Sequence, residues 1–532
     1  MQKIWNHLVL NAQHAPDQAA IMDVSGESER YLSRHELVQA VKKLATELSA
    51  RSYEAVALYA GNSADWIVVD LACQLADIVL LPLPGFFSAG QIQHALKTVP
   101  VDVILTDRPD YLRGLFNTLE SGDHLSVNLQ VMISTAGIDQ PAAAYEFADI
   151  APLDKSAKRR QLLPARTSKI TFTSGSTGTP KGVCLSADHQ ESVAESLDQA
   201  IAELSIQKHL CVLPLSTLLE NIAGVYVPLL QGACIVLASE QQLGFNGAAG
   251  FSVPSFLNML STLRPNSMIL MPQLLQALVI STASGWQAPD SLRFIAVGGG
   301  SVNRLVLDRA VASGLPVYEG YGLSECGSVV ALNTPAARRN GTLGKPLPHV
   351  RTRLVDGELY VADAVFLGYV GEPESWSGHV QESWVATGDL CAADAEAYLH
   401  FQGRRKNLIV SSYGRNISPE WVEREISFDP RIAQVVVFGD SRPFCTALLA
   451  AHNKSVTDYQ LQQILDAANK RLPEYARVQR WIRLDSPLAL GTGAAGDLMT
   501  TNGRPRRAQI EHHFQAELDA LYAGSEEKKY AS

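Results

Sequence analysis

The sequence contains little cysteine, little charge and no clean apolar stretch long enough to cross a bilayer. Its 532 residues include seven scattered cysteines without a CxxC pair, so neither a disulfide framework nor a zinc site is indicated. The net charge of −10 argues against nucleic acid as the main partner. The most apolar stretch, 66–83, contains Asp70, Gln74 and Asp77, which favours a buried helix and strand over a transmembrane segment. The N-terminal residues lack a signal-peptide core, so we expect a cytoplasmic protein.

Hydrophobic residues, in contrast, make up 46% of the chain, and their spacing predicts the fold. Predicted strands such as 55–59, 78–83 and 294–297 alternate with predicted helices such as 64–75 and 253–263. The pattern predicts an α/β fold: a large multi-subdomain N-terminal domain, with two parallel sheets, helices and a small β unit, and a mobile smaller α+β C-terminal domain. The expected limits are 1–402 for the large domain, 403–407 for a hinge and 408–532 for the small domain. The basic run 155–160 is expected to be a solvated linker.

A short stretch rich in glycine and hydroxyl residues, 171–183, carries the strongest chemical signal. Glycines let the backbone approach a ligand closely, and hydroxyls with backbone N–H groups form an anion cradle. A Walker P-loop is rejected because Gly182 follows the lysine where Ser or Thr is needed. A flexible loop without a ligand is the plain alternative. The expected polyphosphate-binding residues are Thr173, Ser174, Gly175, Ser176, Thr177, Gly178 and Lys181.

Two later segments offer groups that suit a nucleotide. The glycines at 298–300 end a predicted strand without side chains, so a flat ring or an acyl chain could lie on the backbone, although a tight turn has the same signature. In the segment 317–325, a tyrosine offers an aromatic face, a serine offers a hydroxyl for a phosphate and a glutamate offers a hard oxygen for Mg²⁺. The candidate residues are Gly298, Gly299, Gly300, Glu319, Gly320, Tyr321, Gly322, Ser324 and Glu325.

Taken in chain order, these segments resemble the motifs of the adenylate-forming (AMP-binding) superfamily, which includes acyl-CoA synthetases, luciferases and the adenylation domains of peptide synthetases. The resemblance covers essentially the whole chain, and the segments 439–450 and 498–507 look most like long-chain fatty acyl-CoA synthetases. It implies that Asp389 accepts the ribose hydroxyls and that Arg404 contacts ribose and phosphate. It also implies that the small domain rotates about Lys406 and that Gly414 leaves room for a pantetheine arm.

Two positions depart from the family pattern. Thr217, within the segment 213–220, stands where relatives often have His or an aromatic residue, which leaves the acyl pocket's shape open; a proline-broken core strand is an equal reading. Arg504 stands where the family has a lysine that bridges the substrate carboxylate and the α-phosphate. Arginine keeps the charge but is planar and wider. Arg504 either serves as this cation with slower adenylation, or the first half-reaction is largely lost; Arg506 is an alternative cation.

The resemblance implies an AMP-forming acid–thiol ligase. With ATP and Mg²⁺ it would convert a carboxylic acid, expected to be a fatty acid, into acyl-AMP and pass the acyl group to a thiol, expected to be coenzyme A. The phosphopantetheine of an acyl carrier protein is the alternative acceptor, and a catalytically impaired nucleotide- or acyl-binding homologue is the alternative function. The implied catalytic residues are Lys181, Glu325, Arg504 and Lys406, with Glu325 as the metal ligand.

Overall fold

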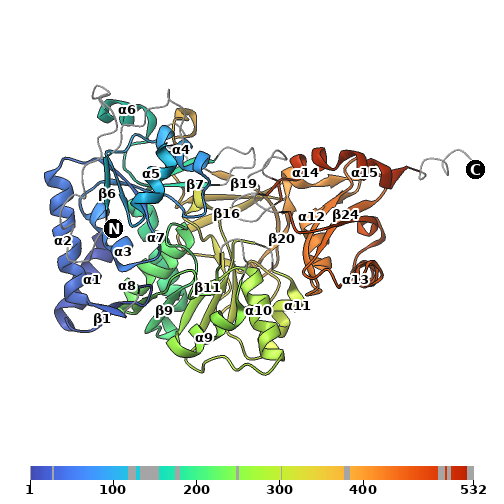
Figure 1. Ribbon diagram of the computed structural model, residues 1–532, viewed down its shortest axis with the longest axis horizontal. Coiled ribbons are helices and arrows are strands. Elements are labelled where there is room, and N and C mark those ends of the chain that lie inside the picture. Colours follow the sequence, from blue (N-terminus) through green and yellow to red (C-terminus); the bar gives the residue numbers. More distant parts are fainter. Residues whose placement is uncertain are drawn as a thin grey trace, which may run out of the picture.

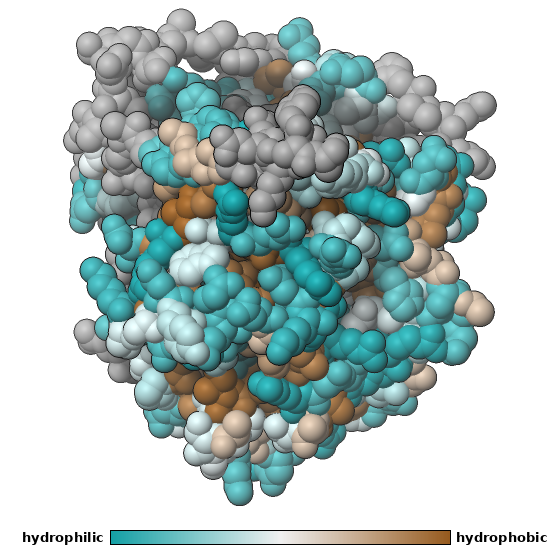
Figure 2. Space-filling view, turned by 90° about the vertical axis from the view of Figure 1, so that its right-hand side faces the viewer, coloured by the Kyte–Doolittle hydropathy of each residue, from teal (hydrophilic) through white to brown (hydrophobic). Residues whose placement is uncertain are grey.

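The structure is a computed structural model with a large N-terminal part and a smaller C-terminal part, at the left and right of Figure 1. It describes residues 2–26, 29–117, 128–131, 155–173, 180–246, 251–300, 302–376, 384–488, 498–499 and 505–523. Among these residues, no helix combines the length and the apolar character that crossing a bilayer requires. The face that carries the small domain is mostly hydrophilic, with separate small apolar patches (Figure 2).

A nine-stranded sheet forms the centre of the large part. Its five inner pairings are parallel, while both edges are antiparallel, so the predicted parallel sheet is in fact mixed. In spatial order its strands are β15 (Lys345–Pro346), β14 (Ala331–Leu332), β13 (Val317–Tyr321), β12 (Phe294–Val297), β11 (Ser267–Leu270), β9 (Lys208–Cys211), β10 (Cys234–Leu237), β1 (Ala19–Asp23) and β2 (Arg30–Ser33).

A seven-stranded sheet packs beside it and is also mixed. Its order is β18 (Gly368–Tyr369), β8 (Lys181–Ser186), β7 (Thr167–Thr173), β4 (Val79–Pro82), β3 (Ala55–Tyr59), β5 (Val103–Thr106) and β6 (Asn128–Val131). The predicted small β unit is confirmed as a four-stranded antiparallel sheet of β16 (Val350–Val355), β17 (Glu358–Asp363), β19 (Val385–Ala393) and β20 (Leu399–Arg404).

Helices fill three layers around the two large sheets, because alternate strand residues point to opposite faces. The core between the sheets is built with α1 (Gln2–His14), α2 (Arg34–Ala50), α3 (Ala64–Leu75), α7 (Ala187–Ile201), a π-helix (Glu220–Tyr226) and α8 (Val227–Gln231). The outer face of the nine-stranded sheet is covered by α9 (Val253–Leu263), α10 (Pro272–Ala283) and α11 (Arg304–Ala312). The outer face of the other sheet is covered by α4 (Ala89–Thr98) and α5 (Pro109–Asn117).

Local sequence explains where several helices begin. Ser33 accepts a hydrogen bond from the backbone N–H of Glu36, whose carboxylate accepts one from the backbone N–H of Ser33. This reciprocal capping box satisfies backbone donors that the first turn leaves unpaired. The same arrangement starts α4 at Ser88 and α13 (Asp458–Asn469) at Thr457.

The small part is α+β, as predicted. A three-stranded sheet of β23 (Ile432–Phe438), β24 (Cys445–Ala451) and β25 (Val478–Leu484) packs with α12 (Pro419–Ile426), α13, α14 (Arg507–His513) and α15 (Gln515–Tyr522). The two-stranded pair β21 (Ile409–Val410) and β22 (Asn416–Ile417) joins it to the small β unit. The sequence limits of the two parts and the small part's rotation remain predictions.

The predicted solvated linker at 155–160 is wrong. These residues lie in α6 (Lys155–Leu162), and Arg159 is buried. Its guanidinium lies 2.9 Å from a Glu54 carboxylate oxygen and 3.0 Å from one of Asp102. Two carboxylates thus offset the cost of removing this charge from water, a pairing that the local run of lysine and arginine does not reveal.

Candidate active site

One cavity of about 2620 Å³ lies at the carboxyl ends of the central strands and extends to the small part. Ligands of open α/β sheets bind in this position, where the strand ends leave a crevice. Most of the predicted site residues that the structure describes line it: Thr173, Lys181, Gly298, Gly299, Gly300, Gly320, Tyr321, Gly322, Ser324, Glu325, Asp389, Arg404 and Lys406. The cavity therefore brings together segments that are more than two hundred residues apart.

Tyr321, Asp389 and Arg404 form one hydrogen-bonded and ion-paired group on the cavity wall. Tyr321 donates to Asp389 Oδ2 at 2.7 Å, and Arg404 Nε lies 2.9 Å from Asp389 Oδ1. The pairing of β19 with β20 places Asp389 directly opposite Arg404. Burial and the neighbouring carboxylate raise the pKa of Tyr321, so its hydroxyl stays protonated. The aromatic ring and the carboxylate predicted for adenine and ribose thus lie in direct contact.

Lys181 and Glu325 meet at Tyr369, a residue that the sequence analysis missed. Tyr369 donates to Glu325 Oε1 at 2.9 Å, and Lys181 Nζ lies 4.8 Å from the centre of the Tyr369 ring. Lys181 also lies 2.8 Å from Glu372. Burial and the charge of Glu325 raise the pKa of Tyr369. In the sequence, Tyr369 is marked only by its place between Gly368 and Gly371. Its contacts with Lys181 and Glu325 join distant segments, so no local pattern predicts them.

The cavity glycines have two different structural roles. A Cβ added at Gly298, Gly299 or Gly300 would meet no atom closer than 3.5 Å, so these positions leave the wall open, as a flat ligand requires. A Cβ at Gly322 would instead lie 1.8 Å from the carbonyl oxygen of Ser328. The close approach of two backbone segments therefore requires glycine at position 322.

The predicted phosphate loop is described only at its two ends. Thr173 and Lys181 are cross-strand partners in the antiparallel pairing of β7 with β8, and both line the cavity. The loop follows directly on strand β7. Ser174, Gly175, Ser176, Thr177 and Gly178 lie outside the described residues.

Two predicted residues do not line the cavity. Glu319 is buried behind it in β13, and burial raises its pKa to about 8 despite the nearby Arg424. Gly414 lies in the exposed turn between β21 and β22, away from the cavity lining. Neither residue contacts the proposed nucleotide site in this arrangement of the two parts.

Arg504 lies outside the described residues, but the chain on both sides of it is described. Met499 pairs with Pro505 in an isolated antiparallel bridge, and the N–H of Arg506 donates to the carbonyl of Leu498 at 2.9 Å. Met499, Pro505 and Arg506 line the cavity. The next residue, Arg507, is anchored by hydrogen bonds of 2.5 and 2.6 Å to the two carboxylate oxygens of Glu423.

The segment 213–220 is a loop leading into the π-helix, not the proline-broken strand that was its alternative reading. Thr217 lines the cavity, and its N–H donates to the carbonyl of Pro214 at 2.8 Å. Glu220 is fully buried and accepts a hydrogen bond from the N–H of Leu213 at 2.9 Å. The loop therefore folds back on the first residue of the helix.

A buried ion pair lies behind this wall. Lys169 Nζ lies 2.7 Å from Asp70 Oδ1, and both side chains are at most 1% exposed. Asn221 and Tyr226 of the π-helix donate to Asp70 Oδ2 at 2.8 and 2.7 Å, and Asn221 also accepts from Lys169. This network ties α3, β7 and the π-helix together.

Comparisons with known proteins agree with this geometry. The family model "AMP-binding enzyme" matches residues 8–371, and "AMP-binding enzyme C-terminal domain" matches residues 406–526. The chain is 25% identical to "Long-chain-fatty-acid--CoA ligase FadD15" of Mycobacterium bovis, over 89% of each chain. It is 24% identical to "2-succinylbenzoate--CoA ligase" of Staphylococcus aureus, over 85% of this chain and 91% of the relative.

Solved structures show the same fold. O-succinylbenzoate coenzyme A synthetase from Bacillus subtilis, in complex with ATP and magnesium ion, superposes with a TM-score of 0.73 at 24% identity, covering 95% of this chain and 99% of the other. The anthranilate CoA ligase AuaEII, in complex with anthranoyl-AMP, gives 0.76 at 17% identity, covering 97% and 98%. The chain therefore belongs to the AMP-binding enzyme family, among its AMP-forming acid–CoA ligases.

Proposed function

We propose that the protein activates a fatty acid with ATP and transfers the acyl group to coenzyme A. The observation that carries this proposal is an apolar extension of the cavity, which we call the acyl arm, joined to the nucleotide groups. The acyl arm is lined by Leu197, Ile201, Ile206, Ala223, Val227, Phe294 and Ala296.

The floor and roof of the acyl arm follow from the fold. Phe294 and Ala296 point from β12 toward the core between the sheets, while Ile295 and Val297 face the opposite core. The roof consists of residues from α7, the π-helix and α8. No lining residue from α7, the π-helix, α8, β11 or β12 carries a charge within the part of the chain that the structure describes. An acid with a second carboxylate or an amine would lack an ionic partner there, whereas an alkyl chain gains from burial.

The residues suggest a division of labour for the two steps. In the first step a carboxylate oxygen attacks the α-phosphorus of ATP, the bond to pyrophosphate breaks, and acyl-AMP forms. Tyr321 and the open glycines would hold adenine, Asp389 would accept the ribose hydroxyls, and Lys181 would hold the β- and γ-phosphates. Mg²⁺ on Glu325 would neutralise phosphate charge; the half-buried carboxylate, with one oxygen accepting from Tyr369, suits a hard cation. In the second step a thiolate displaces AMP.

Carboxylate-dependent release of pyrophosphate tests the first step. The assay contains ATP, Mg²⁺, hydroxylamine as an acyl trap and a panel of short to long fatty acids, aryl acids and amino acids, without a thiol. We expect release with fatty acids only. Coenzyme A and a phosphopantetheinylated carrier protein are then compared as acceptors. Binding of ATP without release by any acid would overturn the proposal and favour the catalytically impaired homologue.

Substitution of Arg504 measures how well arginine replaces the family lysine. We expect Arg504→Ala to lower the rate of acyl-AMP formation by about 100-fold, because a preorganised cation beside the developing charge is lost. Arg504→Lys should keep or raise the rate. Single-turnover formation of acyl-AMP is the measurement, and Arg506→Ala is the matched control. If Arg506→Ala has the larger effect, Arg506 is the working cation.

The acyl arm also predicts a change in chain-length preference. Ala296 lies midway along the floor, and Phe at this position should fill the arm beyond it. We expect Ala296→Phe to lower kcat/KM for long-chain acids at least tenfold relative to short ones, since several buried methylenes at about 0.8 kcal/mol each would be lost. Ile295→Val, on the opposite face of the same strand and outside the cavity lining, is the control. Equal loss for all chain lengths would place the acyl group elsewhere.

A further inference from the structure

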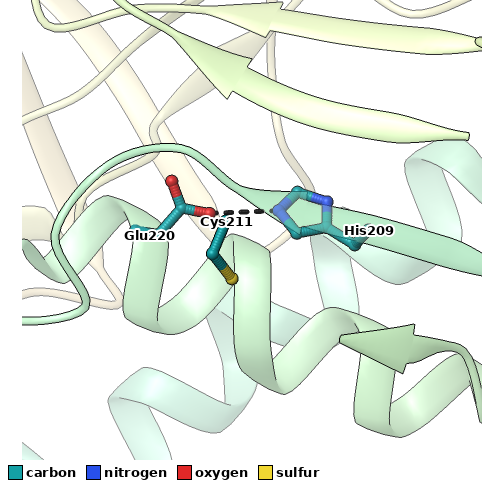
Figure 3. Close-up of side chains that lie close together, drawn as sticks. All are labelled: His209, Cys211 and Glu220. Carbon is teal, nitrogen blue, oxygen red and sulfur yellow. Dashed lines mark hydrogen bonds and ion pairs between the residues drawn. The ribbon is translucent and has the colours of Figure 1, made fainter. Parts of the chain in front are cut away.

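Three metal-ligating side chains of different chemistry meet in the core beside the acyl arm. His209 and Cys211 point from the same face of β9, and Glu220 approaches them from the π-helix (Figure 3). One ligand atom from each lies within 4.8 Å of the other two. All three side chains are buried, with Cys211 and Glu220 at 0% exposure.

The hydrogen bonds of His209 are compatible with a cation between His209 and Glu220 in one of the two neutral tautomers of the imidazole. Nδ1 lies 2.8 Å from Ser267 Oγ, and Nε2 lies 3.0 Å from Glu220 Oε1. When Nδ1–H donates to Ser267, Nε2 and Oε1 face each other as two acceptors, and a metal ion can lie between them. In the other neutral tautomer the Ser267 hydroxyl donates to Nδ1, and Nε2–H donates to Glu220. Among the described residues, His209 is the one ion-pair partner found for Glu220, whose charge is fully buried.

Cys211 adds a third ligand, a sulfur atom that takes no part in the hydrogen bond between His209 and Glu220. Its sulfur contacts the carbonyl of Gly224 at 3.6 Å, a weak interaction. Burial and the charge of Glu220 raise the pKa of this thiol, and a bound cation would reverse that effect. Gly224 is required here: a Cβ would lie 2.2 Å from Glu220 Oε1 and 2.8 Å from His209 Nε2.

We propose that His209 Nε2, Cys211 Sγ and Glu220 Oε1 bind one Zn²⁺ ion that stabilises the junction of β9 and the π-helix. Nitrogen, thiolate and carboxylate are the ligands that Zn²⁺ takes in proteins. Tetrahedral ligands at these bond lengths lie about 3.3 Å apart, so the present 3.0 Å separation opens by a few tenths of an ångström. His209 and Ser267 line the cavity, so the ion and a water as fourth ligand would enter from that side.

The surrounding groups already orient the ligands. Ser267 can accept from Nδ1–H, which is the tautomer that leaves Nε2 free for a metal, and the N–H of Leu213 donates to the second oxygen of Glu220. Such outer partners commonly contribute 10- to 100-fold to metal affinity. Because Cys211 must lose its proton, affinity should rise with pH. Cysteine spacing gave no sign of the site, since the ligands are two and nine residues apart and of three types.

Metal content tests the proposal without any substrate. The full chain is purified without chelators, and zinc is measured by mass spectrometry; we expect about one equivalent. Metal-free protein is then titrated with Co²⁺, which should give a sulfur-to-cobalt charge-transfer band. Cys211→Ala should abolish the band and weaken zinc binding at least 100-fold, and Ser267→Ala should weaken it about 10- to 100-fold. Cys73→Ala, at another fully buried cysteine, is the matched control.

Every outcome bears on the proposal. One equivalent of metal, lost in Cys211→Ala and kept in Cys73→Ala, supports it. Wild-type protein that takes up neither Zn²⁺ nor Co²⁺ overturns it, and the cluster then holds a proton; this result does not depend on whether any variant folds. Metal that remains bound in Cys211→Ala also overturns it. The ligase activity enters none of these measurements, so the two proposals fail separately.

Discussion

Glu325→Gln is expected to lower the rate of acyl-AMP formation by about 100- to 1000-fold, the effect of removing one preorganised electrostatic group from a transition state that accumulates negative charge. The substitution keeps the size of the side chain and an acceptor for Tyr369, so the wall around it should persist. What it removes is the negative charge that would hold Mg²⁺.

The dependence on magnesium separates this explanation from a structural one. In Glu325→Gln the half-saturating concentration of Mg²⁺ should rise, and high Mg²⁺ should recover part of the rate. Glu374→Gln, at an exposed glutamate that is absent from the cavity lining, is the matched control and should behave as wild type. An unchanged rate and magnesium dependence in Glu325→Gln would remove Glu325 from the metal site.

Lys169→Met is expected to destabilise the large part by about 3–5 kcal/mol, because Asp70 would keep a fully buried charge without its partner. Burial lowers the pKa of Lys169 while Asp70 opposes that shift, so the pair depends on both members. A loss of this size lowers Tm by roughly 4–6 °C in a domain of this scale. Thermal unfolding followed by circular dichroism measures it.

The double variant Asp70→Leu/Lys169→Met provides the control for this prediction. Removing both charges removes the unpaired buried ion, so the double variant should be more stable than the sum of the two single losses predicts. Additive losses would show that the two side chains act separately. Lys208→Met is the matched substitution of a lysine outside the network.

The sequence predicted individual strands well wherever their hydrophobic pattern was unbroken. Phe294–Val297, Ala55–Tyr59 and the helix Val253–Leu263 occur with the expected limits, because local pattern and burial agree there. The antiparallel edges were not predictable in this way. β14 and β15 are only two residues long, and their pairing depends on the sheet that is already formed.

Site residues were predictable where one short segment carried the chemistry. The nucleotide-binding candidates Tyr321 and Asp389 were found separately, and the structure adds the hydrogen bond between them. Tyr369 was missed because its role depends on two partners from distant segments. Arg159 was misread for the same reason: whether a basic run is solvated depends on carboxylates that lie far away in sequence.

The network around Asp70 and Lys169 also fixes the distance between the two halves of the proposed substrate site, the phosphate loop and the acyl arm. Lys169 belongs to the strand that ends at Thr173, where the phosphate loop begins, and its partners Asn221 and Tyr226 belong to the helix that roofs the acyl arm. If phosphate and acyl chain bind as proposed, the spacing between them would be set by a few buried polar atoms. Substitutions in the π-helix that enlarge the acyl arm should therefore weaken ATP binding. An engineered change of substrate has to preserve the distance between the phosphate loop and the acyl arm.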